Sequence, residues 1–244
     1  MVFNLTAYKH ATQSLATFDR TQRSGLELGP IQFLLYRIFA RGWRDFFKHR
    51  TSDASDLVNP LFAVPAALGD EHVRNCRMFA NRRSMLMSLE KRGVWVEVGT
   101  YEGAFAREIE NICDPRELHL IDIDFSRVRD KHYVEETEVI KFHQGLSADI
   151  LSSFPDAYFD YIYIDADHDL WAVARDVEAA KPKLKLDGWL IFNDYIYFSH
   201  TDMAPYGIVP VVNALCVEEN WEMVAFALQF KMYCDVAIRR VRRV

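Results

Sequence analysis

Polar side chains follow two apolar segments that have the composition of buried strands, 159–164 and 189–192. They comprise four carboxylates, one imidazole and one amide: Asp165, Asp167, His168, Asp169, Asn193 and Asp194. Such a group is unfavourable unless a cation compensates its charge. Carboxylate and amide oxygens are hard donors, which suit Mg²⁺ or another hard divalent cation better than a thiophilic metal. We therefore predict a metal held by Asp165, Asn193 and Asp194; the alternative is ordinary turn chemistry, because Asp and Asn are common in loops after strands.

A glycine turn between a strand and a helix forms a second candidate site. The apolar run 94–98 is rich in valine, ends at Gly99, and is followed four residues later by Gly103. Glycine lets the backbone of such a turn approach a nucleotide-like ligand, because a Cβ would block the approach or forbid the turn's dihedral angles. The residues predicted to contact that ligand are Glu97, Gly99, Thr100, Tyr101 and Gly103.

Two later strand ends carry groups suited to the rest of a nucleoside. Asp122 lies about twenty residues after the glycine turn, where a carboxylate commonly accepts hydrogen bonds from ribose hydroxyls. Its alternative role is that of a solvated acid at a strand end. The segment 145–149 is small and polar, which suits an adenine edge, although Ser147 equally fits a helix N-cap. The further residues predicted to contact the ligand are Asp122, Ile123, Ser147, Ala148 and Asp165.

Strands and helices alternate along the part of the chain that carries these groups. Strands are expected at 94–98, 118–123, 139–142, 159–164 and 189–192, and helices at 103–112, 126–133, 147–153, 170–181 and 207–219. Two final strands, 222–229 and 232–239, are joined by too few residues for a helical crossover, so they form an antiparallel hairpin. This pattern predicts an α/β fold with a doubly wound, mainly parallel, seven-stranded sheet. Ligands bind such sheets beyond the carboxyl ends of the strands, where the candidate groups lie.

The chain before this region has a different organisation. Residues 1–29 lack sustained periodicity, and an amphipathic helix is expected from Pro30 onward, packed on the main domain or on a partner chain. A loop is expected over 51–70, then a helix capped by Asp70 that runs to about Lys91 and ends at Gly93. We predict two parts: an N-terminal arm with a helical cap or oligomerisation segment (1–70) and a cofactor-binding domain (71–244).

Composition restricts the class of protein. The net charge of −6 over 244 residues argues against binding to a nucleic-acid backbone, which requires a basic surface. The four cysteines are scattered, as expected for free thiols in a reducing compartment. No run of about eighteen apolar residues is present, so neither a membrane span nor a membrane partner is expected. We predict a cytoplasmic location.

The candidate motifs together resemble a known family. Glu97-Val-Gly-Thr-Tyr-Glu-Gly103 resembles the S-adenosylmethionine turn of class I methyltransferases, and more narrowly the Glu-x-Gly-x-Tyr-x-Gly form of catechol-type, metal-dependent O-methyltransferases. Asp122 stands at that family's ribose acid, and 145–149 is similar to its adenine-contacting Gly-x-Ser-x-Asp. The metal positions fall on Asp165 and on the Asn193-Asp194 pair, whose order is inverted relative to the family's Asp-Asn. The resemblance covers roughly 72–240 and implies a Rossmann-like methyltransferase fold.

The resemblance also implies an activity. S-adenosylmethionine would be the cofactor, and a metal-assisted transfer would methylate a hydroxyl group of a small molecule. The family's lysine base corresponds in position to His168, whereas the broader group that contains bacterial sugar O-methyltransferases would use Asp167 as the base. Two other classes remain open: an NAD(P)-dependent oxidoreductase of Rossmann type, and a non-catalytic methyltransferase-like binding protein. A homodimer is the default expectation for assembly.

Overall fold

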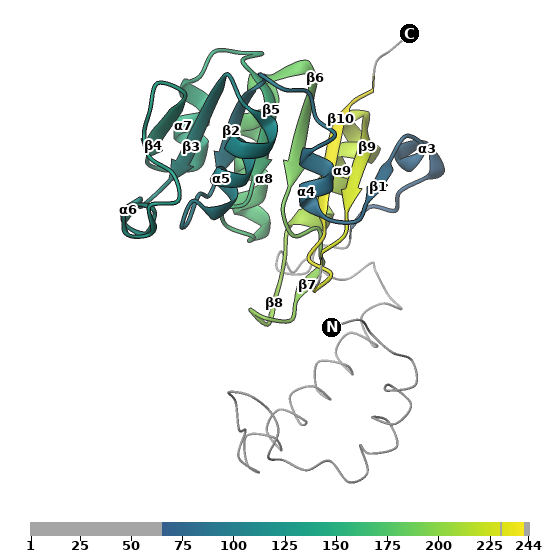
Figure 1. Cartoon of the computed structure of the whole chain (residues 1–244). Coiled ribbons are helices and arrows are strands. Elements are labelled where there is room, and N and C mark those ends of the chain that lie inside the picture. Colours follow the sequence, from purple (N-terminus) through teal and green to yellow (C-terminus); the bar gives the residue numbers. More distant parts are fainter. Residues whose placement is uncertain (1–64, 230, 242–244) are drawn as a thin grey trace, which may run out of the picture. The chain divides into compact units, whose positions relative to one another are not determined.

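One sheet of eight strands forms the centre of the molecule in the computed structural model, which describes residues 65–229 and 231–241. The strand order is β1-β9-β10-β6-β5-β2-β3-β4, with β1 and β4 at opposite edges (Figure 1). The strands are β1 (Arg77–Phe79), β2 (Val94–Val98), β3 (Glu117–Asp122), β4 (Ile140–Gln144), β5 (Phe159–Ile164), β6 (Leu184–Phe192), β9 (Trp221–Ala227) and β10 (Asp235–Arg240).

The pairing confirms the predicted fold class. Strands β4, β3, β2, β5 and β6 are mutually parallel, and β10 runs antiparallel to both β6 and β9. All seven predicted strands are present, so the sheet is the Rossmann-like arrangement closed by a terminal hairpin. Strand β1 adds an eighth member that the sequence did not predict, parallel to β9 at the edge. The order reverses between β5 and β2, which is where such a sheet opens a crevice for a ligand.

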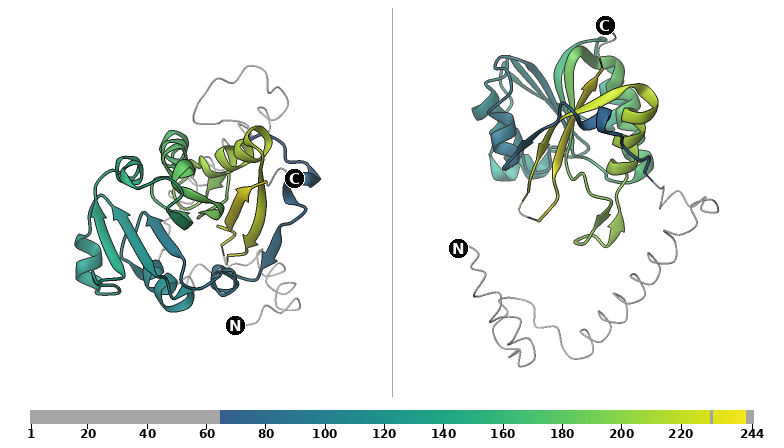
Figure 2. Two further views of the ribbon diagram at one scale, coloured as in Figure 1. Left: turned by 90° about the horizontal axis from the view of Figure 1, so that it is seen from above. Right: turned by 90° about the vertical axis from the view of Figure 1, so that its right-hand side faces the viewer.

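Helices cover both faces of the sheet (Figure 2). They are α3 (Asp70–Val73), α4 (Arg82–Leu86), α5 (Ala104–Cys113), α6 (Ser126–Lys131), α7 (Ser147–Ser153), α8 (Leu170–Ala180) and α9 (Ile208–Glu219), with a 3₁₀ turn at Lys181–Lys183. Buried residues of α4, α5 and α6 belong to one apolar cluster, and those of α7, α8 and α9 belong to a second. Trp95 contributes to the first cluster and Val96 to the second, because alternate residues of a strand point to opposite faces.

The helix predicted from Asp70 to Lys91 is wrong. The segment instead contains α3, β1 and α4, and the last of these ends at Leu86, well before Gly93. Asn81 explains the break, because its side-chain oxygen accepts a hydrogen bond from Ser84 N at 2.8 Å and so caps a new helix. Gly69, not Asp70, stands at the N-cap of α3.

A small hairpin interrupts the loop expected after β6. It consists of β7 (Phe198–Ser199) and β8 (Ala204–Pro205), which pair antiparallel outside the main sheet. Ser199, Thr201 and Asp202 are joined by hydrogen bonds to the hydroxyl groups of Tyr206 and Tyr233, so this loop has a defined shape.

The predicted arm and amphipathic helix over 1–64 lie outside the described residues, and the domain boundary at 70 stays a prediction. Among the helices that the structure describes, none combines the length and the apolar character that a membrane span requires. The cytoplasmic location likewise stays a prediction.

Candidate functional site

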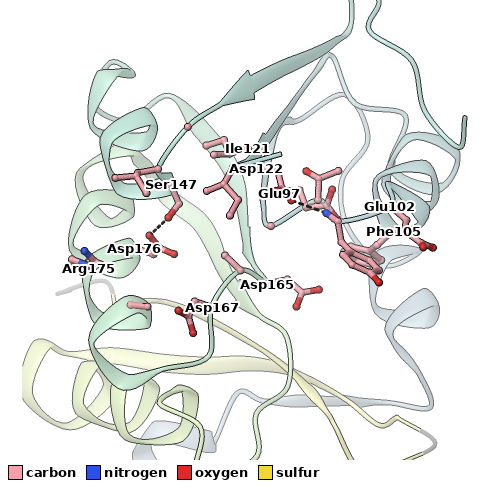
Figure 3. Close-up of a pocket in the computed structure, with 18 of the residues that line it drawn as sticks. Glu97, Glu102, Phe105, Ile121, Asp122, Ser147, Asp165, Asp167, Arg175 and Asp176 are labelled. Atoms are coloured by element: carbon pink, nitrogen blue, oxygen red, sulfur yellow. Dashed lines mark hydrogen bonds between the residues drawn. The ribbon is translucent and has the colours of Figure 1, made fainter. Parts of the chain in front are cut away.

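A cavity of about 730 Å³ opens beyond the carboxyl ends of β2, β3 and β5 (Figure 3). Most of the residues predicted for ligand binding line it: Glu97, Gly99, Thr100, Tyr101, Asp122, Ile123, Ser147 and Asp165. Asp167, one of the two predicted bases, lines it as well. Its volume lies in the range of ordinary small-molecule and cofactor sites. We call it the cofactor cavity.

Glycine is required at the two positions of the turn for different structural reasons. Gly99 has φ +90°, and a Cβ there would lie 2.2 Å from the carbonyl oxygen of Asp165. Gly103 has φ +83°, stands at the N-cap of α5, and packs against Val134 instead of lining the cavity. Glycine is therefore needed at 99 because the backbone at the end of β5 passes close by, and at 103 because the turn enters the left-handed region.

Glu97 and Thr100 line the cavity, and each carries a buried polar atom. Glu97 is 1% exposed, and neither its Oε2 nor Thr100 Oγ1 has a hydrogen-bond partner among the described residues. Burial, followed by the negative charge of Asp165, raises the pKa of Glu97 well above its usual range. Buried polar atoms normally have partners, so two such atoms on a cavity wall indicate a place where a ligand's polar groups bind.

The carboxylate of Asp122 is held at the cavity edge by backbone groups. Tyr101 N donates to its Oδ2 at 2.8 Å and Asp124 N donates to its Oδ1 at 3.0 Å. Tyr101 has φ +52°, and the guanidinium of Arg127 lies 4.7 Å from the centre of its ring. The orientation of the carboxylate is thus fixed before any ligand binds, and its remaining lone pairs can accept from ligand hydroxyls.

Ser147 contacts a residue that the sequence analysis missed. It is the first residue of α7, whose N-cap is Leu146, so the N-cap alternative is wrong. Its hydroxyl donates to Asp176 Oδ1 of α8, and both residues line the cavity (Figure 3). Burial raises the pKa of Asp176. Ala148 lies outside this cavity's lining.

The predicted metal ligands do come together, but both polar atoms of the Asn193 amide are already engaged. Asn193 Nδ2 donates to Asp165 Oδ1 at 2.6 Å, while Asn193 Oδ1 accepts from Arg82 Nη2 at 2.5 Å. Burial raises the pKa of Asp165 to about 7, and burial followed by the charge of Asp235 raises the pKa of Asp194 to about 6.

This donor set does not fit a divalent cation. The amide oxygen that would bind the metal faces a guanidinium, which is itself a cation. Within 65–229 and 231–241, no group of three His, Cys, Asp or Glu side chains is arranged to hold a metal ion. The Mg²⁺ that the sequence suggested therefore has no support in the arrangement of these residues.

Arg82 is the cation of this region, and it comes from the segment mispredicted as mid-helix. Its Nε and Nη2 donate to the two carboxylate oxygens of Asp235 at 3.0 and 3.1 Å. Tyr163 donates to the same carboxylate at 2.9 Å. No sequence signal could have paired Arg82 with Asp235, because 153 positions separate them. Asp176, by contrast, left a signal: it interrupts an apolar stripe of α8 at helical spacing.

The two predicted bases lie in different environments. Asp167 is exposed, and its Oδ1 accepts from the backbone N–H of Asp169 at 2.9 Å. His168 Nε2 is buried without a hydrogen-bond partner in the described part of the chain, 3.8 Å from both Asp165 Oδ1 and Asp194 Oδ2. Burial lowers the pKa of His168, so its ring is neutral near pH 7 and can accept a proton.

A second cavity of about 790 Å³ adjoins the first. Ala104 and Phe105 line both, so the two cavities meet at the start of α5. The other residues of its wall are Asn81, Arg82, Arg83, Glu108, Asp194, Thr201, Asp202, Tyr206, Gln229, Lys231 and Tyr233. Asp194 is the member of the acidic cluster that faces this space, and the ring of Tyr206 stacks on His168 with centroids 4.4 Å apart.

Comparisons with known proteins give one family match and several structural likenesses. Residues 96–195 match the family described as a methyltransferase domain, and this match supports S-adenosylmethionine-dependent methyl transfer. No curated protein matches the chain. Similar solved structures include a ribosomal protein L11 methylase from Lactobacillus delbrueckii subsp. bulgaricus, with 16% identity, TM-score 0.49 and coverage of 73% of this chain and 82% of that one.

Two further structures have comparable scores. A putative type 11 methyltransferase from Sulfolobus solfataricus has 18% identity, TM-score 0.47 and coverage of 63% of this chain and 86% of that one. The N-methyltransferase NodS from Bradyrhizobium japonicum has 17% identity, TM-score 0.47 and coverage of 66% and 95%.

Proposed function

We propose that this chain, whose residues 96–195 match a methyltransferase domain, transfers the methyl group of S-adenosylmethionine to a hydroxyl group of a small molecule. The observation that carries the proposal is the pair of buried, unpartnered oxygens, Glu97 Oε2 and Thr100 Oγ1, on the wall of the cofactor cavity. An acidic oxygen and a hydroxyl in that position suit the charged amino-acid end of the cofactor. The same end is absent from nicotinamide dinucleotides, which favours methyl transfer over the oxidoreductase alternative.

Other residues of the cavity would contact the ribose and the adenine of the cofactor. Asp122 would hold the ribose hydroxyls, because its carboxylate is already oriented by two backbone N–H groups. Ile123 and Ser147 would flank the adenine, and Asp176 holds the Ser147 hydroxyl in place. When bound, S-adenosylmethionine supplies a methyl group that the positive sulfur has already activated.

The second cavity is the place for the acceptor in this proposal. It adjoins the cofactor cavity at Phe105, and its wall contains Asp194, the neighbour of His168. Methyl transfer to a hydroxyl requires alignment of the oxygen and removal of its proton. Asp194 lines the second cavity and His168 does not, so a ligand there would contact Asp194. His168, which is neutral and lies 3.8 Å from Asp194, would be the base that accepts the proton. Asp167 remains the alternative base, on the cofactor side.

The test is calorimetric titration of the purified full chain with S-adenosylhomocysteine, for the wild type and for Glu97→Gln. We expect micromolar binding by the wild type and at least a tenfold loss in the variant, because the positive charge of a bound ammonium group favours ionisation of the Glu97 carboxyl, whereas an amide cannot ionise. Glu110→Gln, at an exposed position of α5, is the matched control and should bind like the wild type. A folded, ligand-free wild type that does not bind S-adenosylhomocysteine would contradict the proposal.

The acceptor class is tested separately, by incubating the enzyme with methyl-labelled cofactor and small-molecule panels of alcohols, phenols and amines. Label that appears in an ether product supports transfer to a hydroxyl group. Label that appears only in N-methylated products would overturn the hydroxyl assignment while leaving methyl transfer intact.

A further inference from the structure

The charge of Arg82 acts on four carboxyl groups, and one of them, Asp235, is in direct contact with its guanidinium. Glu97 lies in β2 next to its last residue, Asp165 and Asp194 follow β5 and β6, and Asp235 begins β10. Burial raises the pKa of each of these carboxyl groups, and the charge of Arg82 opposes that rise in all four. A group of acidic side chains such as this one is unfavourable unless a cation compensates its charge. In this structure, the side chain of Arg82 supplies that positive charge.

The guanidinium is held rigidly. Nε and Nη2 form a two-point contact with the carboxylate of Asp235, which is 0% exposed. The rings of Phe105 and Tyr163 lie 4.6 and 5.8 Å from the guanidinium carbon. A planar cation that pairs with a carboxylate at two points and stacks on an aromatic ring is fixed in both position and orientation.

Asn193 links the guanidinium of Arg82 to the carboxylate of Asp165. Its amide oxygen accepts from Arg82 Nη2, and its amide nitrogen donates to Asp165 Oδ1. A metal at this point would need the amide oxygen, and turning the amide around would place the nitrogen against the guanidinium. The hydrogen bond from Arg82 therefore fixes which atom of Asn193 faces Asp165.

We propose that the guanidinium of Arg82 supplies the positive charge that a divalent ion would otherwise supply at this site. Through Asn193 it positions Asp165, and methyl transfer is therefore independent of metal. The catalytic part of this inference rests on the proposed function; the binding part does not. Arg82 is a positioning residue, since it acts on the acidic cluster through Asn193.

Metal binding is measured first, by the loss of the electron paramagnetic resonance signal of free Mn²⁺ as the full chain is added, with S-adenosylhomocysteine at saturation. We expect no binding by the wild type at up to about 1 mM Mn²⁺, which is the weak end of the affinities at which proteins hold hard divalent cations. Stoichiometric Mn²⁺ binding by the wild type that is lost in Asp165→Asn would overturn the proposal. Calorimetry reports the proposed function independently, because binding of S-adenosylhomocysteine can fail while Mn²⁺ binding is unaffected.

Activity with the acceptor identified above provides the second readout. Turnover should be the same in EDTA and in Mg²⁺, and a loss of more than tenfold in EDTA that Mg²⁺ restores would contradict metal independence. Arg82→Lys keeps the charge but not the two-point geometry, so we expect kcat to fall more than tenfold with KM for the cofactor changed less than threefold. Unchanged kcat in this variant would contradict the positioning role.

A double substitution that removes both charges controls for variants of Arg82 that lose activity because they fold poorly. Arg82→Met leaves Asp235 buried and unpaired, and its Tm should fall by about 10 °C. Arg82→Met combined with Asp235→Asn should recover most of that loss, whereas an additive loss would contradict the pairing. Arg77→Gln, which changes an exposed arginine outside both cavities, should match the wild type in Mn²⁺ binding and in turnover.

Discussion

The turn after β2 and the end of β5 are packed backbone to backbone, so that a Cβ on Gly99 would lie 2.2 Å from the carbonyl oxygen of Asp165. Gly99 N donates to Ile121 O at 2.8 Å, and Asp165 N donates to Val98 O at the same distance. The floor of the cofactor cavity is thereby set by main-chain contacts among three neighbouring strands. Substitution at Gly99 must disturb all of them.

Gly99→Ala should therefore destabilise the protein by about 3 kcal/mol, since it combines a φ of +90° with a backbone clash. The folded fraction of the variant should bind S-adenosylhomocysteine with an affinity at least tenfold lower than that of the wild type. Urea denaturation and calorimetry measure the two effects. The control is Gly69→Ala, where the added methyl group would meet only the flexible side chain of Glu71. Equal stability of the two variants would count against this account of the turn.

Asp122→Asn and Asp124→Asn form a matched pair of neighbouring substitutions. Asp122 lines the cofactor cavity and Asp124 does not; Asp124 instead accepts from Ser126 at the start of α6. We expect the first substitution to weaken binding of S-adenosylhomocysteine by 10- to 100-fold, about 1.5–3 kcal/mol, because hydrogen bonds to a charged acceptor are the stronger kind. The second should leave the affinity within twofold. Comparable losses in both variants would disprove the assignment of the ribose acid.

Ser147→Ala removes a donor from the buried carboxylate of Asp176. We predict a loss of about 1–3 kcal/mol in the free energy of unfolding, measured by urea denaturation, because a buried acceptor is left unsatisfied. Adding Asp176→Ala should cost less in the Ser147→Ala background than in the wild type, since the two side chains share one interaction. Ser152→Ala, which affects an exposed hydroxyl of the same helix, serves as the control. Strict additivity of the two substitutions would show that the hydrogen bond contributes nothing.

The pair of histidines between β3 and β4 should make stability depend on pH. His119 Nδ1 lies 2.9 Å from His143 Nε2, and burial lowers the pKa of both rings. The unfolded chain then binds more protons than the folded one below about pH 6.5, so the free energy of unfolding should fall as the pH falls from 7 toward 5. The slope cannot exceed about 1.4 kcal/mol per pH unit for each ring.

The groups around this pair act in known directions. The carboxylate of Glu117 opposes the lowering of the pKa of His119, whereas the charge of Lys141 adds to it. His119→Phe should flatten the dependence between pH 7 and 5, as followed by urea denaturation at a series of pH values. His200→Gln, at an exposed position in the loop after β6, should not change the slope. A slope in His119→Phe as steep as that of the wild type would place the titrating group elsewhere.

Local patterns were sufficient to predict most of the fold. Strand β2 is buried at all its positions, so a short run rich in valine identifies it, whereas α5 repeats apolar residues at helical spacing. The segment 70–91 failed because its apolar residues match a helical period by chance. There, Arg77 and Met78 are exposed and Phe79 is buried, and a strand of three residues is too short to show an alternation in the sequence.

The site divides in the same way. Glu97, Gly99 and Asp122 follow strands, and parallel strands deliver their ends to one edge of a sheet, so their meeting could be predicted. Arg82 and Asp176 reach the site from helices, and their contacts depend on how distant elements pack. The predicted Mg²⁺ has no support in the arrangement of the described residues: the acids were visible in the sequence, whereas the position of Arg82 beside Asn193 and Asp235 was not.

The two-point contact between Arg82 and Asp235 has a consequence for how the enzyme could be shortened or recombined. The recognisable domain ends at residue 195 and begins at 96, and both partners of the contact lie beyond these limits. A transplanted 96–195 segment would carry Glu97, Asp165 and Asp194 but not the arginine that balances them. A segment that keeps this charge balance must therefore extend at least from residue 82 to residue 235, well beyond the part that sequence similarity detects.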